Sequence, residues 1–203
     1  MKIESFKTNN ITVLFSEPIN HILISQTTLF NLFKTGDEEK DKFTFVEAPG
    51  LKVLLFPNQK KELAFEGLRI LVNDKNEVGP EDSSVIDDFQ KILNKDIMDQ
   101  NKISAYGFNY DVVVRPESSS FNISDLVGNK ISQIYGLKSA GVNASFEKDN
   151  IVYTLNIKPI GSGDKFFANF NAHFNVNKLP NTDELKKQIK QQFEVFTDLI
   201  QNI

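Results

Sequence analysis

The chain of 203 residues contains no cysteine and only two histidines. Without cysteine there are no disulfides, no thiolate metal sites and no cysteine nucleophile. Two histidines alone do not make a transition-metal site, so the fold would have to bring carboxylates to them. Nothing in the spacing of the acidic residues requires such a cluster. We therefore expect no metal and no other cofactor.

Long hydrophobic runs and an excess of positive charge are also missing. No stretch approaches the roughly 20 apolar residues that are needed to cross a bilayer. No apolar signal-peptide core follows Lys2 at the start. The formal net charge is −4, whereas duplex binding normally rests on a basic patch that neutralises phosphates. The sequence predicts a cytoplasmic protein that binds neither membranes nor nucleic acids.

Signatures of catalysis are absent as well. The chain has no phosphate-binding Walker loop, no glycine-rich dinucleotide fingerprint after a strand, no nucleophile elbow and no zinc-protease motif. We therefore assign no catalytic residue and favour a protein that is not an enzyme.

The sequence does contain a repeated pattern. Ile3, Phe6 and Asn9 are echoed about a hundred positions later by the trio Ile103, Tyr106 and Asn109. Each trio opens a strand-like run, which is followed by a helix, three strands and an amphipathic helix. The connection at 99–101 is short and has no linker composition. We predict a single domain over 1–203, made of two repeat-like units at 1–99 and 102–203.

The periodicity of apolar residues gives the expected elements. Strands are predicted at 3–15, 43–47, 51–56, 62–72, 102–115, 140–147, 151–158 and 165–177. Helices are predicted at 25–34, at 84–98, from 123 to Gly136, and after Pro180. The parity of apolar residues changes within 62–72, at Gly67, which predicts a β-bulge there. Asn122 and Asn181 resemble N-caps of the third and fourth helices.

These elements predict an α+β protein. In our prediction, the tandem pseudo-symmetric β-α-β-β-β-α units form one largely antiparallel sheet of about eight strands, with four helices packed on one face. The element order resembles that of the TATA-binding protein. No motif supports membership of that family, and the chain lacks the basic residues that a minor-groove binder of this kind would carry.

A sheet covered on one side alternates apolar and polar residues along each strand. In the second unit, the polar positions are rich in amides and hydroxyls and poor in charge. Such side chains both donate and accept hydrogen bonds, so they can recognise polar groups. The predicted partner-binding face comprises Asn109, Asn143, Thr154, Asn156, Asn169, Asn171, His173 and Asn175.

Three interpretations of this face remain open: a merely solvated surface, a homodimer interface, or a platform for a protein or ligand. The leading functional hypothesis is a non-enzymatic binding or assembly module that associates with a protein partner or with itself. The alternative is a small-ligand carrier or enzyme with a pocket between sheet and helices. Tyr106, Tyr110 and Tyr153 would line that pocket, unless they lie at the rim of the core with their hydroxyls at the surface.

Overall fold

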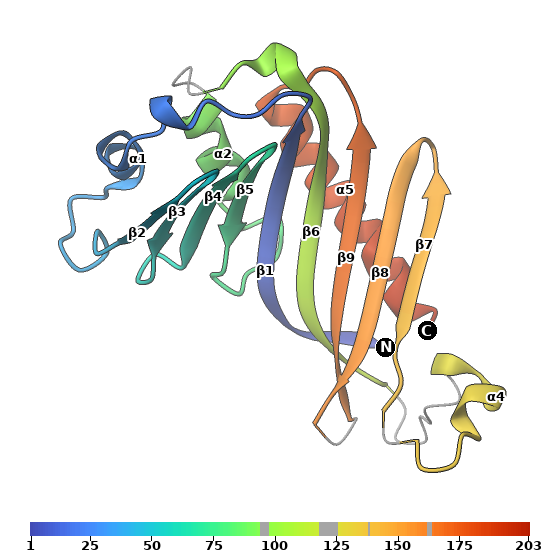
Figure 1. Ribbon diagram of the computed structural model, residues 1–203. Coiled ribbons are helices and arrows are strands. Elements are labelled where there is room, and N and C mark those ends of the chain that lie inside the picture. The colour runs from blue at the N-terminus through green and yellow to red at the C-terminus, as the bar shows by residue number, and fades with distance from the viewer. Residues whose placement is uncertain (94–97, 118–125, 138, 162–163) are drawn as a thin grey trace.

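The computed structural model describes residues 1–93, 98–117, 126–137, 139–161 and 164–203. Its main feature is one open antiparallel sheet with the strand order β2-β3-β4-β5-β1-β6-β9-β8-β7 (Figure 1). The strands are β1 Lys2–Phe15, β2 Thr44–Ala48, β3 Leu51–Phe56, β4 Lys61–Glu66, β5 Arg69–Asp74, β6 Ile103–Arg115, β7 Val142–Lys148, β8 Ile151–Ile160 and β9 Lys165–Asn175. The predicted α+β class and the single antiparallel sheet are confirmed.

The sheet has nine strands rather than about eight, because the segment predicted as one strand over 62–72 is a hairpin. β4 and β5 pair from Lys61 with Asp74 to Glu66 with Arg69. Gly67 lies in the turn with a φ of +43°, a left-handed conformation that glycine adopts without steric cost. The predicted β-bulge at Gly67 is wrong. The parity of apolar residues changes there because the chain reverses direction.

The described part of the chain has four α-helices: α1 Gln26–Phe33, α2 Val85–Leu93, α4 Asn129–Ser132 and α5 Thr182–Gln201. Two short 3-10 helices, η1 His21–Leu23 and η2 Gln100–Lys102, precede α1 and β6. α1, α2 and α5 lie on one face of the sheet, whereas α4 lies beyond one end of it (Figure 1). The prediction that all four helices pack on one face is therefore wrong for α4.

The residues around α4 show why the third predicted helix does not join the core. Ile131 and Ile134 were expected in its buried stripe, but they are 45% and 56% exposed. The helix has only four residues and follows Gly128, which has a φ of +80°. A helix of about one turn is too short to present a buried stripe to the sheet. The expected N-cap at Asn122 and the start of the stripe at Ile123 lie outside the described residues.

α5 is the longest of the described helices and covers the centre of the sheet. The side chain of Asn181 accepts a hydrogen bond from the backbone N–H of Glu184 at 2.9 Å, which confirms the predicted N-cap. Its buried stripe comprises Leu185, Ile189, Gln192, Phe196 and Ile200. Phe196 packs at 5.1 Å from Phe170 of β9, ring centre to ring centre. The predicted stripe included Phe193, but this residue is only half-buried. The neighbouring Gln192 is buried in its place.

β1 and β6 are neighbours at the centre of the sheet and pair along almost their whole length. The trios that open them do not occupy equivalent positions. Asn9 is buried on the helix side, where Nδ2 donates to the carbonyl oxygen of Val78 at 2.8 Å. Asn109 lies on the opposite side of the sheet and donates to Oδ1 of Asn10.

Candidate functional site: the open face of the sheet

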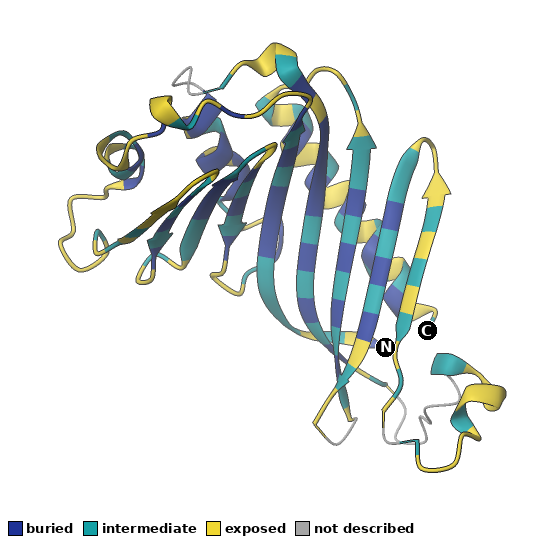
Figure 2. Ribbon diagram, in the orientation of Figure 1, coloured by how far each residue is buried: buried dark blue, intermediate teal, exposed yellow. Residues whose placement is uncertain are grey.

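We call the side of the sheet turned away from α1, α2 and α5 the open face. On β6 and β9, core residues such as Tyr110 and Phe170 are buried, and they alternate with half-buried Asn109 and Asn171. Figure 2 shows this alternation as stripes of dark blue and teal along each strand. The eight predicted residues share the open face: Asn109, Asn143, Thr154, Asn156, Asn169, Asn171, His173 and Asn175.

One row of amides crosses four strands. Asn171 of β9 donates from Nδ2 to Oδ1 of Asn109 at 2.7 Å. Asn109 of β6 donates in turn to Oδ1 of Asn10 at 2.6 Å. Asn10 of β1 donates to Oδ1 of Asn73 of β5 at 2.8 Å. These side chains face each other because the strand register places them directly opposite.

Asn10 is the best-satisfied member of this row. Its Nδ2 also donates to the carbonyl oxygen of Val72 at 3.1 Å, and its Oδ1 also accepts from the Thr12 hydroxyl at 2.9 Å. With two hydrogens donated and two hydrogen bonds accepted, its amide uses its full capacity. Asn10 is accordingly buried, and it fixes the row at the boundary between β1 and β6.

A second row runs beside the first, shares β6 and β9 with it, and extends to β8 and β7. Asn143 of β7 donates to Oδ1 of Asn156 at 2.5 Å, and Asn156 of β8 donates to Oδ1 of Asn169 at 3.5 Å, a long contact. Asn169 of β9 donates to Oδ1 of Asp111 of β6 at 2.7 Å. Each amide in this row donates toward the centre of the sheet, so Asp111 is the final acceptor.

Asp111 is the charged member of this second row. Burial raises the pKa of its carboxyl above the usual value, and the hydrogen bond from Asn169 offsets that rise in part. A half-buried carboxylate that receives one amide hydrogen bond is under-solvated. It is therefore an acceptor that a donor from a partner could satisfy.

His173, Asn175 and Thr154 complete the predicted set. His173 lies between Gly107 of β6 and Val152 of β8 in the register, and its Nε2 is 3.1 Å from Oδ1 of Asn175. A Cβ at Gly107 would lie 3.0 Å from the carbonyl oxygen of Ala172, so glycine allows β6 and β9 this close approach. His173 thus acts as a hydrogen-bonding residue of the face.

Sequence reasoning missed two members of the first row, Asn10 and Asn73. The signal for Asn10 was present, since Asn10 and Thr12 alternate with the apolar Ile11 and Val13. Asn73 was missed because the strand over 62–72 was predicted to end before it.

An aliphatic row crosses β2–β5 on the open face, and this was also missed. The register places Val46 opposite Val53, Val53 opposite Ala64, and Ala64 opposite Leu71. Among these, Val46 is exposed, while Val53 and Leu71 are half-buried. The open face therefore combines this aliphatic row on β2–β5 with the two amide rows, which run from β5 to β7.

The tyrosines proposed for a pocket fill the core instead. Tyr106, Tyr110 and Tyr153 are buried, and each hydroxyl donates to α5: to Gln188 Oε1 at 2.6 Å, the Ile189 carbonyl oxygen at 2.5 Å and Gln192 Oε1 at 2.9 Å, respectively. The expectation that these hydroxyls reach the surface is wrong. α5 supplies a hydrogen-bond acceptor for each of them.

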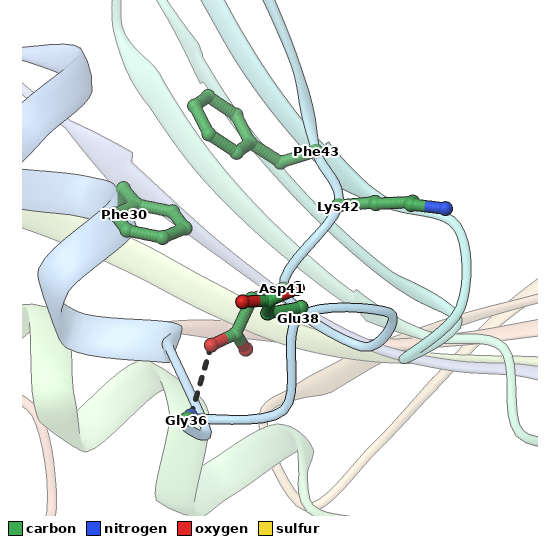
Figure 3. Close-up of a pocket in the computed structure, with 6 residues that line it drawn as sticks. All are labelled: Phe30, Gly36, Glu38, Asp41, Lys42 and Phe43. Carbon is green, nitrogen blue, oxygen red and sulfur yellow. Dashed lines mark hydrogen bonds between the residues drawn. The ribbon is translucent and has the colours of Figure 1, made fainter.

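Hollows on the surface lie elsewhere. One hollow of about 480 Å³ lies between Phe30 of α1 and Phe43 and is also lined by Gly36, Glu38, Asp41 and Lys42. Figure 3 shows these six residues. The Asp41 carboxylate accepts from the backbone N–H of Gly36 at 2.9 Å and therefore serves its own loop. Another hollow, of about 370 Å³, lies between Pro18, Leu23 and Met98. Neither hollow is lined by the three tyrosines.

Within the described residues, no group of three or more histidine, aspartate or glutamate side chains is placed to hold a metal ion. None of the described helices is both long and apolar enough to cross a membrane. No family model and no curated protein matches this chain.

Proposed function

We propose that this protein is a non-enzymatic binding or assembly module and that the open face is its recognition surface. The observation that carries the proposal is the pair of amide rows. Asparagine side chains on adjacent strands hold each other in fixed positions by hydrogen bonds. Because their rotamers are already ordered, these side chains lose less conformational entropy when a partner binds than mobile side chains would.

The amides of the rows keep capacity for a partner. An asparagine side chain offers two hydrogens and two lone pairs. Asn109 uses one hydrogen for Asn10 and one lone pair for Asn171, so one of each remains. A polar partner with both donors and acceptors, such as peptide groups, matches this pattern. The aliphatic row that contains Val53 and Leu71 supplies apolar area beside the amides.

The tandem arrangement is part of the same proposal. β1 and β6 lie together at the centre, β5 and β9 flank them, and α2 contacts α5 on the helix side. This order supports two related units within 1–99 and 102–203, joined through their first strands. The recognition surface then spans both units, and the protein acts as one cytoplasmic body rather than as two separable domains.

The test is a tagged pull-down from lysate of the source organism, with a variant that carries Asn169→Lys and Asn171→Lys. A matched control carries Gln191→Lys and Gln201→Lys, two exposed positions of α5, so that both variants gain the same charge. Circular dichroism checks that each variant folds. A partner lost with the face variant and kept by the control supports the proposal. A partner kept by both variants contradicts it.

A further inference from the structure

The two edges of the sheet differ in how well they are protected. At one edge, β2 has five residues, and Glu47 on its core side pairs with Lys52 at 2.9 Å. An inward-pointing charge is a device that keeps another strand from adding to an edge. At the other edge, β7 has seven residues, and the core-side positions Val142, Ala144 and Phe146 carry no charge. The only charge on the core side of β7 is Lys148 at its last residue, so most of the strand has no such protection.

Among the described residues, no strand lies against the outer edge of β7. Within the described part of the chain, its backbone pairs with β8, and no turn or loop is hydrogen-bonded to it. An unpaired row of N–H and C=O groups is a template for an added strand.

The core is also incompletely covered at this edge. Phe146 stacks on Tyr153 of β8 with ring centres 5.0 Å apart. Tyr153 is buried, whereas Phe146 and Val142 are half-buried. The apolar layer between sheet and helices therefore ends at β7 with part of its surface in contact with water.

α5 adds apolar area beside the same edge. One side of α5 faces β8, where Gln192 accepts a hydrogen bond from Tyr153. The other side faces β1, where Phe193 packs on Phe6. Val195 and Leu199 follow on the Gln192 side of the helix and are half-buried. Figure 1 shows the C-terminal end of α5 reaching the side of the sheet where β7 lies.

We propose that a second copy of this chain pairs through β7, antiparallel, about a two-fold axis perpendicular to the sheet. Such an axis keeps the helix layers of both copies on one side of the continuous sheet. The C-terminal ends of both α5 helices then flank the seam and bring Val195 and Leu199 over it. An extended peptide from another protein would satisfy the edge but would leave these helix residues uncovered.

The sequence of β7 suits pairing with itself. Full overlap of Val142–Lys148 places Ser145 opposite Ser145, Ala144 opposite Phe146, and Asn143 opposite Glu147. No like charges then face each other, which such a pairing requires. Asn143 already donates one hydrogen to Asn156, so its second hydrogen can reach the carboxylate of Glu147 in the partner. The second amide row would continue across the interface.

This inference rests on the proposed function, because it names the partner and the edge through which the module assembles. Its failure is separable from failure of the open face. Variants on β7 leave Asn169 and Asn171 in place, and the face variant leaves the edge of β7 unchanged.

Sedimentation velocity of the purified chain over a wide concentration range tests the stoichiometry. We expect a dimer for the native chain and a monomer for Ala144→Lys, which places a charge on the core side of the edge. The control Ala48→Lys adds the same charge at the end of the opposite edge strand, β2, and should remain a dimer. A native chain that is monomeric throughout, or an Ala144→Lys variant that stays dimeric, overturns the inference.

A single thiol tests the register. Because the chain has no cysteine, Ser145→Cys introduces a lone thiol at the expected two-fold axis. Residues directly opposite in antiparallel strands have Cα atoms about 4.5–5.5 Å apart, which is within disulfide range. We expect rapid linkage into dimers at a rate independent of dilution, and none for Val46→Cys at the middle of β2. Linkage of both variants at equal rates, or linkage that slows on dilution, contradicts the register.

Discussion

Asn109 and Asn10, 99 positions apart in the sequence, are joined by a side-chain hydrogen bond of 2.6 Å across the central strand pair. The bond links the first half of the sheet to the second on the open face. Asn10 uses all of its hydrogen-bonding groups within the protein, whereas Asn109 keeps one hydrogen and one lone pair for a partner. The same contact therefore orders the open face and the boundary between β1 and β6.

Replacing Asn109 by alanine should destabilise the protein. The change removes the donor to Asn10 and the acceptor of Asn171, and Asn10 is 5% exposed, so water replaces the lost bond poorly. We expect the free energy of unfolding to fall by about 1–2 kcal/mol, measured by urea denaturation. The control Asn175→Ala, at an exposed position of the same face, should change it by less than about 0.5 kcal/mol. Equal losses for the two variants would argue against an ordered row.

Replacing Asp111 by asparagine should stabilise the protein at neutral pH. Burial raises the pKa of the Asp111 carboxyl in the folded state, so folding penalises the charged form. That penalty exists above the pKa and vanishes as the pH falls below the unfolded value of about 3.9. Asn169 can still donate to the new amide oxygen. We expect a higher melting temperature than native at pH 7 and no such gain at pH 3, measured by calorimetry.

Replacing Asp74 by asparagine should have the opposite effect. Burial by itself raises the pKa of Asp74, but hydrogen bonds from Ser83, Asn76 and Ser84 outweigh it and lower the pKa. The stability from these bonds is present above the unfolded pKa and is lost as the pH falls through the folded pKa. At pH 7 we expect a loss of about 1–2 kcal/mol in urea denaturation.

The loss for Asp74→Asn should shrink in acid, because the native carboxyl is then protonated as well. Asp82→Asn, at an exposed position before α2, is the control and should stay within about 0.5 kcal/mol of native. A loss for Asp74→Asn that is the same at pH 7 and in strong acid would contradict this account.

Alkali should unfold the protein through its core tyrosines. Burial raises the pKa of Tyr106 to about 12, whereas an unfolded tyrosine ionises near about 10. The contribution of Tyr106 to stability is therefore complete below about pH 10 and is lost as the pH rises toward the folded value. Because Tyr106→Phe removes the hydrogen bond to Gln188, we expect its free energy of unfolding to fall by about 1 kcal/mol at pH 7. We expect the stability of this variant to depend less on alkaline pH than that of the native chain. Thermal melts at several pH values, with tyrosinate absorbance, provide the measurement.

Much of the fold could be predicted from local pattern. The alternation on β6 and β9 and the cap at Asn181 are set within a few residues, since side-chain period and capping are local properties. The turn at Gly67 shows the limit of that reasoning. A change of parity fits both a bulge and a hairpin, and the pairing of Arg69 with Glu66 decides between them.

The candidate site divides in the same way. The sequence by itself determined that Asn169, Asn171 and Asn109 share one face, because on each strand they alternate with apolar residues that must face the core. Only the tertiary structure decided that Asn171 faces Asn109 and that Asn109 faces Asn10, because register depends on pairing between segments far apart in the chain. The same long-range pairing placed Tyr106, Tyr110 and Tyr153 beneath α5 and, within the described residues, left the outer edge of β7 without a paired strand.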